Sequence, residues 1–482
     1  MNEVTLSRRQ MLRMLALGAV GAVAAACAPQ PAPAPQTPEA PAATEAPAAT
    51  EAPVATAVPT AASEPAPAAE KVELDFVYHF WPGWKESVAK LSDMFTAKHP
   101  NITIKYEPID WGELKTTQTP RFAAKDPCDV IIADGSFPWT AEGQLIDLLP
   151  LVDRDGVDLT KVSDLKIGQV IGDPKKGQYG VPLYLVGTVF AYNKGLFDKY
   201  GVTYPKEGWT IEDMGKMAAA LTRDKNDRSP LDADFDPKNI VLQGLRFWGG
   251  QMWDQFIHAF GGRLWTDDWM TCTLDDPKTI ECFKFWSDLS CKQHAVMGPG
   301  APVDQAAGDP FVSERVAVAI DGDWMFSLWQ SIEGFDWDVA ATPQGPGGQF
   351  SYGASDTVGI PKDSKHIEEA WEFVKFLVFD KETQLIVGEN LGPSYIEAAL
   401  DDRFIQSKKG KRGPNLDNAR WVFKMIHEHT VADYYNQTNR TQEWQPIFND
   451  MGSSILDLCD QEVEPLLKDT ARQITEILQK QE

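Results

Sequence analysis

The feature that most limits the fold is an alternation of strand-like and helix-like segments that begins at Val72. Val72–Tyr78 and Ile102–Tyr106 have the composition of strands, and Ser87–Lys98 between them places its apolar residues on one helical face. Val130–Ala133 is apolar throughout, which is typical of a strand buried on both faces. Strands that alternate with helices predict a largely parallel sheet with right-handed crossovers, and therefore an α/β fold.

Helical patterns recur further along the chain. Lys278–Ser290 and Glu368–Phe379 place apolar residues at helical spacing, and the sequence from Asn415 onward is mostly helical in pattern. At 482 residues the chain is longer than one ordinary hydrophobic core accommodates. Two lobes or domains are therefore expected.

The first 27 residues have the order of an export signal. The pair Arg8-Arg9 precedes a short apolar stretch, Met14–Ala26, which ends in small residues before Cys27. The pair resembles a twin-arginine signal; a fortuitous pair in an ordinary export signal is the alternative. Val23–Cys27 resembles a lipobox, in which cleavage precedes a cysteine that then carries diacylglycerol; plain cleavage after Ala-x-Ala is the alternative. We expect a signal peptide over residues 1–26 and lipidation of Cys27.

Residues 27–70 combine that anchor with a tether. Of residues 28–70, 17 are Ala and 11 are Pro, and none is aromatic, Lys or Arg. Proline lacks an amide donor and blocks helix propagation, so an extended and disordered linker is expected. The tether sets the reach of the folded part and carries no chemistry.

The charge of the chain excludes one class of partner. Asp and Glu number 70 and Lys and Arg 45, which gives a net charge of −25 with histidine neutral. Binding nucleic acid requires Lys and Arg to neutralise phosphates, so a nucleic-acid partner is not expected. Apart from the N-terminal segment, no apolar run approaches the roughly 20 residues that a membrane-spanning helix needs.

No motif of an enzyme stands out. Asp153, Asp155 and Asp158 could serve hydrolysis, but the residues between them favour a solvated turn. His427-Glu428-His429 lacks the spacing of a zinc-protease helix, and we expect it on the surface. The sequence contains no Gly-x-Ser-x-Gly nucleophile motif and no phosphate loop. We therefore expect a protein that is not an enzyme and holds no cofactor.

Metal and disulfide signals are weak. The acidic loop Asp224–Asp236 has a composition that calcium favours, but basic residues interrupt it and EF-hand spacing is absent, so a solvated loop is the preferred interpretation. We predict no metal site. Five cysteines follow Cys27, an odd number, so at least one stays unpaired. A bridge from Cys272 to Cys282 or Cys291 is the candidate pairing.

Aromatic and short polar residues follow the three predicted strands. In open parallel sheets, ligands bind beyond the carboxyl ends of the strands. A tryptophan face stacks on the C–H face of a sugar ring, and Asp and Ser side chains bind its hydroxyl groups. The alternative for Trp84, Trp139 and Trp286 is that they fill the core, an interpretation favoured for Trp286 because it lies on the apolar face of a predicted helix. The candidate ligand contacts at these strand ends are Trp81, Trp84, Asp110, Trp111, Asp134, Ser136 and Phe137.

Six segments, in chain order, resemble motifs of family 1 of the extracellular solute-binding proteins of ABC importers, which includes maltose-binding proteins. Each segment alone is a weak signal, but their shared order over Lys71–Glu482 is a strong one. The segments are Asp134–Asp147, Tyr179–Tyr184 with Val189–Lys194, Trp248–Gly262 with Leu274–Pro277, Val316–Trp324, Val358–Ser364 and Ala370–Phe373.

This resemblance implies a two-lobed periplasmic-binding-protein-like fold of type II. Each lobe would be a mostly parallel sheet flanked by helices, with the ligand in the cleft between the lobes. The first lobe would comprise residues 71–183 and 357–393, and the second 187–352 and 398–482. The connections between the lobes would be Tyr184–Thr188, Tyr352–Asp356 and Pro393–Ala398.

The resemblance also implies ligand contacts from both lobes. Residues of the first lobe that it implicates are Trp81, Asp134 and Ser136. Those of the connections and the second lobe are Tyr184, Trp248, Gln251 and Trp324, with Trp444 as a further candidate. Tyr352 and Ser355, in the second connection, complete the candidate ligand contacts.

The function implied is that of a membrane-anchored solute-binding component of an ABC importer. It would capture a small solute, with a mono- or oligosaccharide favoured, by closure of the lobes, and deliver it to the membrane permease. Its partners would be that solute, the permease and the lipid bilayer, reached through Cys27 on the outer face of the cytoplasmic membrane. The alternative is an anchored glycan-binding or sensor protein that delivers its ligand to a receptor.

Overall fold

The computed structural model divides the chain into two units, Met1–Ala66 and Pro67–Glu482, and all the described residues belong to the second. The expected signal peptide, Cys27 and the tether up to residue 69 lie outside the described part. The structure describes residues 70–79, 83–134, 139–140, 142–169, 177–300, 308–432 and 440–480.

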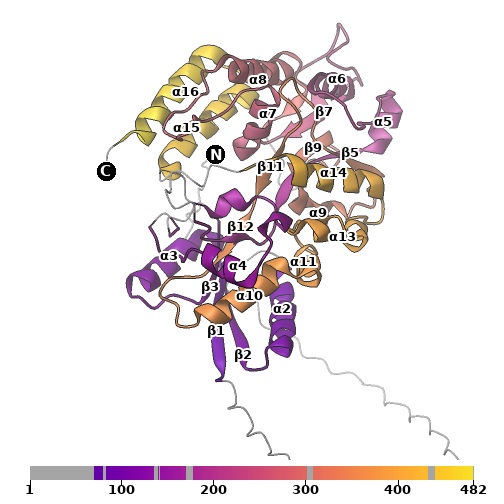
Figure 1. Ribbon diagram of the computed structural model, residues 1–482. Coiled ribbons are helices and arrows are strands. Elements are labelled where there is room, and N and C mark those ends of the chain that lie inside the picture. The colour runs from indigo at the N-terminus through magenta and orange to yellow at the C-terminus, as the bar shows by residue number, and fades with distance from the viewer. Residues whose placement is uncertain are drawn as a thin grey trace, which may run out of the picture. The chain divides into compact units, whose positions relative to one another are not determined.

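A five-stranded sheet contains the three strands expected near the start of the fold (Figure 1). Its order is β2-β1-β3-β12-β4. β1 pairs in parallel with both β2 and β3, as the helices between these strands require. β12 is antiparallel to β3 and to β4, so the sheet is mixed. The strands are β1 (Val72–His79), β2 (Ile102–Ile109), β3 (Val130–Asp134), β4 (Val181–Pro182) and β12 (Asp356–Gly359).

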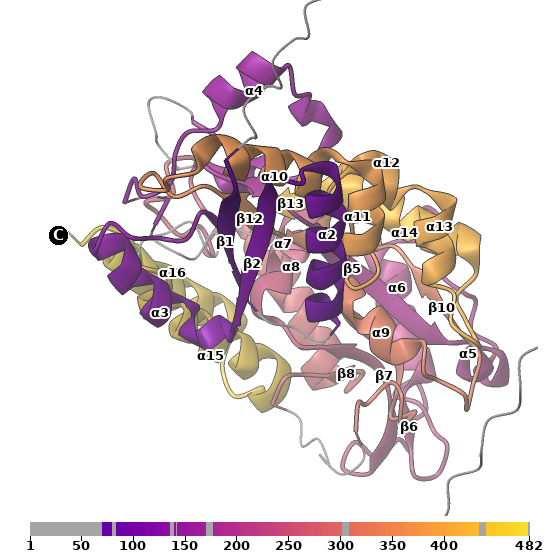
Figure 2. The same cartoon turned by 90° about the horizontal axis from the view of Figure 1, so that it is seen from below.

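Both faces of this sheet are covered by helices. Phe76 and Tyr78 of β1 belong to the core formed with α2 (Trp84–Lys98) and α10 (Ile367–Phe379). Val77, between them, belongs to a smaller core under α3 (Trp111–Ala123). Successive strand residues point to opposite faces, so a strand covered on both sides is apolar throughout. Figure 2 shows α2 beside β2.

Shorter elements complete this part of the fold. The Gly156 cap of α4 has the left-handed conformation, with φ of 63°, that commonly ends a helix. The elements are α4 (Leu149–Asp155), η1 (Leu159–Lys161), η2 (Leu165–Gly168), α11 (Lys381–Val387) and α12 (Ile396–Ala399).

A second sheet has the order β13-β11-β5-β9-β7-β6, with β10 paired to β5 and β8 to β7. β5 is buried along its whole length and is antiparallel to β9, β10 and β11. Parallel pairing is confined to β7 with β8 and β9, and to β11 with β13. The strands are β5 (Val186–Asn193), β6 (Arg223–Asp224), β7 (Ile240–Phe247), β8 (Val296–Met297), β9 (Val316–Gly322), β10 (Trp337–Ala340), β11 (Ser351–Ala354) and β13 (Thr430–Ala432).

Helices cover this sheet as well, and α15 and α16 lie side by side near the C-terminus (Figure 1). The α-helices are α5 (Lys194–Tyr200), α6 (Ile211–Leu221), α7 (Trp253–Ala259), α8 (Pro277–Ser287), α9 (Phe326–Trp329), α13 (Asp402–Ser407), α14 (Leu416–His429), α15 (Thr441–Ser453) and α16 (Val463–Leu478). Shorter helical turns are η3 (Gly250–Met252), η4 (Asp288–Lys292), η6 (Asp323–Met325) and η8 (Ser454–Leu458). Among the described residues, no helix combines the length and the apolar character that crossing a membrane requires.

The three segments that the sequence predicts as connections between the lobes lie side by side. The amide of Leu183 donates to the carbonyl of Asp356, and the amide of Leu185 donates to the carbonyl of Gly392, each over 2.9 Å. Tyr184 forms an isolated β-bridge with Pro393. These backbone bonds tie the three segments together, and the limits of the lobes remain a prediction.

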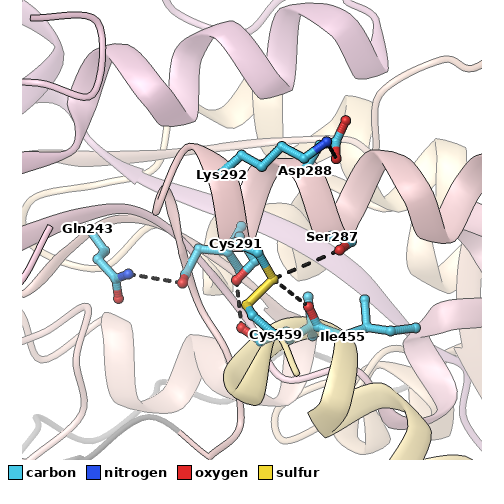
Figure 3. The surroundings of a disulfide bond; sticks show 10 residues. Gln243, Ser287, Asp288, Cys291, Lys292, Ile455 and Cys459 are labelled. Atoms are coloured by element: carbon cyan, nitrogen blue, oxygen red, sulfur yellow. Dashed lines mark hydrogen bonds and ion pairs between the residues drawn. A yellow bond between two sulfur atoms is a disulfide. The ribbon is translucent and has the colours of Figure 1, made fainter. Parts of the chain in front are cut away.

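One disulfide joins two helical turns that pack against each other (Figure 3). Cys291, in η4, is bonded to Cys459, which follows η8 and lies 168 residues further along the chain. The predicted bridge from Cys272 is therefore wrong. Cys128, Cys272 and Cys282 are free and buried, where they pack as small apolar side chains.

Candidate functional site

A pocket of about 290 Å³ lies between η3 and α15. Trp248 and Gln251, two of the predicted contacts, line one side of it. Its size is at the lower end of the roughly 300–1,000 Å³ typical of ligand pockets, which suits one ring of a ligand. The remaining lining residues are Gly249, Gly250, Trp253, Pro299, Gln445, Asn449, Gly452 and Ser453.

The α15 side of this pocket was missed by sequence reasoning. Gln445, Asn449 and Gly452 are spaced four and three residues apart, so they share one face of the helix. That spacing was visible in the sequence, but it did not reveal which element faces the helix. The preceding residue, Trp444, points elsewhere: it is 0% exposed and packs edge-on against Trp265, with ring centroids 5.0 Å apart. Trp444 as a ligand contact is therefore wrong.

The pocket is linked to a connecting segment through Tyr352. The Tyr352 hydroxyl donates to Oε1 of Gln251 over 2.7 Å, and its backbone amide donates to Oε1 of Gln255 over 3.0 Å. Tyr352 belongs to β11, which runs directly into the connection that ends at Asp356. The predicted contacts Gln251 and Tyr352 are thus brought together.

A second cluster of polar side chains lies at the connecting segments. Nε2 of His79, the last residue of β1, lies 3.1 Å from Oδ2 of Asp356. The Tyr184 hydroxyl hydrogen-bonds the same carboxyl group. Burial raises the pKa of Asp356 to about 7, and the Tyr184 hydrogen bond opposes that rise. Tyr184 thus lies at a buried polar site, whereas His79 and Asp356 were not predicted.

Ser355 contacts a carboxylate from outside the predicted set. Its hydroxyl donates to Oδ2 of Asp164 over 3.3 Å. Asp164 has a left-handed φ of 62°, which is uncommon for a residue other than glycine. Burial raises the pKa of Asp164 to about 7, while the Ser355 bond and the charge of Lys166 oppose the rise.

Trp324 lies where the two large cores meet. It is partly buried and packs against both the core of the five-stranded sheet and that of the second sheet. Its ring folds back over Gly322, where a Cβ would lie 2.0 Å from the ring. The next residue back, Asp323, is buried and accepts a hydrogen bond from the Gly187 amide over 3.1 Å. The turn that carries Trp324 is thus held against the first connecting segment.

The remaining predicted contacts have different positions. Trp84 is 0% exposed and packs edge-on against Tyr78, so it fills the core and the ligand prediction for it is wrong. Asp110 caps α3 by accepting from the Gly112 amide over 3.1 Å. Asp134 ends β3, opposite Asp356 in the pairing of strands. Trp111 begins α3, but its side chain, like all of Trp81, Ser136 and Phe137, lies outside the described residues.

The acidic cluster near α4 has structural partners. Asp155 accepts from Nε1 of Trp371 over 2.8 Å and from Nζ of Lys375 over 2.6 Å. Asp158 caps η1 by accepting from the Thr160 amide. Asp155 therefore stabilises the end of α4 and Asp158 the start of η1, which is a structural role for both carboxylates.

His427 departs from the expected surface position. Its Nδ1 lies 2.7 Å from Oγ of Ser163, and burial lowers the pKa of His427 to about 4. The histidine is therefore neutral near pH 7. Glu428 and His429 are exposed on α14, whereas His427 is only partly exposed.

The acidic loop is organised by its own backbone. The buried carboxylate of Asp224 accepts from the amides of Asn226, Arg228 and Asp236 and from Nε of Arg228. These donors occupy the oxygens that a cation would need. Within the described ranges, no cluster of His, Cys, Asp or Glu has the arrangement of a metal site.

Comparisons with known proteins agree with this architecture. The model of the bacterial extracellular solute-binding protein family matches residues 82–384. An uncharacterised extracellular-binding protein of an ABC transporter from Pyrococcus horikoshii is 25% identical over 315 residues, which cover 62% of this chain and 67% of that protein.

Solved structures show the fold. The sugar-binding protein MalE of Xanthomonas citri has a TM-score of 0.67 at 18% identity, over 84% of this chain and 97% of that chain. An ABC substrate-binding protein of Listeria monocytogenes in complex with cycloalternan has a TM-score of 0.66 at 20% identity, over 84% of this chain and 99% of that chain. The expected two-lobed fold of type II periplasmic binding proteins is confirmed.

Proposed function

The chain belongs to the bacterial extracellular solute-binding protein family, and from that premise we propose that it captures a carbohydrate outside the cytoplasm for an ABC importer. The family and fold are those of binding proteins, and we propose that the chain catalyses no reaction. Its work is then to bind a solute, release it to the permease and return unchanged.

The observation that carries the carbohydrate assignment is the lining of the pocket. Trp248 offers an aromatic face, and Gln251, Gln445 and Asn449 offer amide groups that both donate and accept hydrogen bonds. Sugar rings present an apolar C–H face and a rim of hydroxyl groups, which such a combination matches. The structural neighbour MalE is described as a sugar-binding protein, and the Listeria protein was solved in complex with cycloalternan, which supports the same class.

Capture would proceed by closure of the lobes over the sugar. Gln251 lines the pocket, and Trp324 packs against the cores of both sheets. A ligand that touches both lobes binds the closed form better than the open form and so shifts the population toward closure. The permease would then recognise the closed form and reopen it.

We further propose that the chain is anchored to the outer face of the cytoplasmic membrane. The lipobox-like segment ending at Cys27 supplies the anchor, and residues 28–70 supply the reach. The disulfide between Cys291 and Cys459 supports an oxidising compartment, because such bonds are rare in the cytoplasm. Metabolic labelling with a radioactive or clickable fatty acid tests the anchor: wild type should be labelled, and a Cys27→Ser variant should not.

A thermal-shift screen tests the proposed cargo. The chain is heated with neutral sugars (maltose, mannotriose, N,N′-diacetylchitobiose, mannitol) and with charged solutes (glucose 6-phosphate, spermidine, short peptides). A ligand at 100 times its dissociation constant stabilises the folded state by about 2.7 kcal/mol, a shift of a few degrees. A shift with one neutral sugar class supports the proposal. A shift only with peptides, polyamines or sugar phosphates would contradict it.

A further inference from the structure

The floor of the pocket contains a buried hydrogen-bond donor. Trp253, the first residue of α7, is 0% exposed and packs its ring edge-on against Phe247, with centroids 4.8 Å apart. Its indole Nε1 has no acceptor among the described residues, although Trp253 lines the pocket. A buried N–H group without an acceptor is costly, so such groups nearly always find a partner.

Two glycines leave space beside this nitrogen. An atom at the Cβ position of Gly452 would lie 3.1 Å from Nε1, and its next nearest neighbour would be 3.9 Å away. An atom at the Cβ position of Gly249 would lie 3.0 Å from the same nitrogen. N–H···O hydrogen bonds span about 2.7–3.2 Å. A side chain at either position would therefore crowd the nitrogen, and glycine leaves both of these sides of the indole N–H uncovered.

The pocket distinguishes Trp253 from other buried tryptophans. Nε1 of Trp286, Trp329 and Trp337 also lacks an acceptor among the described residues. None of these three lines the pocket, and they belong to the packed cores. Trp286 packs edge-on against Trp253 itself, with centroids 5.7 Å apart, which makes it a matched comparison.

Among the described residues, no charged side chain lines the pocket. Its lining is made of Trp, Gln, Asn, Ser, Gly and Pro. A charged group of a ligand would lose hydration there without gaining an ionic partner, whereas a neutral polar group can bond to the amide side chains.

We propose that this pocket holds one uncharged sugar unit and that Trp253 Nε1 donates a hydrogen bond to one of its oxygens, a ring hydroxyl or an acetamido carbonyl. This assignment rests on the proposed function, because it names the sugar oxygen that the pocket would bind and the side chain that would bind it. Gly452 and Gly249 contribute by having no side chain, because a Cβ at either position would lie 3.0–3.1 Å from the indole nitrogen.

The test adds a methyl group beside the donor. In Gly452→Ala, the new Cβ would lie 3.1 Å from Trp253 Nε1 and hinder the approach of an acceptor, while alanine is a better helix former than glycine within α15. Gly195→Ala is the control, because it makes the same change at the start of α5, where the Cβ would lie 3.3 Å from an Asn193 oxygen. Calorimetric titration with maltose, mannotriose and N,N′-diacetylchitobiose measures affinity, and thermal unfolding measures stability.

We expect Gly452→Ala to weaken sugar binding at least about tenfold with no loss of thermal stability, and Gly195→Ala to bind as wild type. Loss of maltose or mannotriose binding would identify a hydroxyl acceptor, and loss confined to diacetylchitobiose an acetamido carbonyl. If both variants bind the sugar with wild-type affinity, the inference is overturned and the proposed function stands. No binding of any neutral sugar to wild type would overturn both.

A second pair of variants isolates the N–H group. Trp253→Phe removes the donor and Trp286→Phe removes a neighbouring indole that does not line the pocket, so both lose core packing. We expect only Trp253→Phe to lose sugar affinity at a temperature where both variants remain folded. Equal loss in the two variants would contradict the assignment. A glucuronate or glucosamine unit bound as tightly as glucose would also contradict the uncharged class.

Discussion

The Tyr352 hydroxyl donates a hydrogen bond to Oε1 of Gln251 over 2.7 Å, and this bond joins a connecting segment to the pocket wall. Tyr352 lies in β11, next to Gly353, which pairs antiparallel with Gly187 of β5. Gln251 lies in η3. A ligand that contacts Gln251 therefore acts on a side chain that is bonded to the segment between the sheets. The Tyr352 hydroxyl thus links the pocket wall to the connecting segment.

Removing that hydroxyl should weaken sugar binding modestly. In Tyr352→Phe the ring keeps its packing, but Gln251 loses a donor that orients its amide. A hydrogen bond of this kind contributes about 0.5–1.5 kcal/mol, so we expect an affinity loss of roughly three- to tenfold. Calorimetric titration checks this, and an affinity equal to wild type would show that Gln251 does not need Tyr352.

Trp324 should contribute more than any other predicted contact. It packs against both cores at their junction and is only partly buried, so its ring is available to a ligand. We expect Trp324→Ala to cost about 2–4 kcal/mol of binding free energy, as loss of an aromatic anchor does. Trp444→Phe, in a fully buried ring, is the control and should leave affinity unchanged. Unchanged binding by a folded Trp324→Ala chain would remove Trp324 from the site.

The stability of the fold should depend on pH through Asp164. Burial raises its pKa from 3.8 to about 7, so the folded chain holds this proton more tightly than the unfolded chain does. The resulting stabilisation is complete below pH 3.8 and is lost as the pH rises through 7. Asp164→Asn should therefore gain stability relative to wild type between pH 4.5 and pH 8, as measured by urea unfolding. A constant difference across that range would contradict the raised pKa.

The disulfide should stabilise the end of α15. Cys291 and Cys459 lie 168 residues apart, and the loop they close holds much of the second sheet. Loss of a native disulfide typically costs about 2–5 kcal/mol, so Cys291→Ser should lower the midpoint of chemical unfolding. Reductant should destabilise wild type and leave the variant unaffected.

The thiol count provides an independent check. After unfolding without reductant, three of the five cysteines that follow Cys27 should be alkylated, and all five after reduction. Mass spectrometry gives both numbers. Alkylation of all five before reduction would exclude the bridge.

The strands and helices of the first sheet were predictable because periodicity reports burial directly. β1, β3 and α10 begin and end within about two residues of the predicted segments, since their apolar residues repeat at the strand or helix period. The strands that follow the connecting segments, β5 and β12, pair antiparallel with their neighbours, although parallel pairing was expected. β12 enters the sheet from the second lobe's side without a crossover helix, and it pairs antiparallel with β3.

The site was only partly predictable, because it depends on which faces meet. Trp84 and Trp444 have the same side chain as Trp324, but they sit in helices whose inward faces bury them. Gln445 and Asn449 carry no signal of their own until α15 is placed against η3. The pairing of Cys291 with Cys459 likewise follows from contact between η4 and η8, which are remote in sequence. Each of these features is set by tertiary contacts that no local pattern encodes.

The position of a bound sugar in a crystal structure tests the central claim most directly. The chain is crystallised with the neutral sugar that stabilises it most in the thermal-shift screen. The account predicts density for a sugar that stacks on Trp248 or Trp324, with an oxygen within hydrogen-bonding distance of Trp253 Nε1 and contacts from both sheets. Density for the sugar away from these tryptophans, with the pocket beside Gly452 unoccupied, would contradict it.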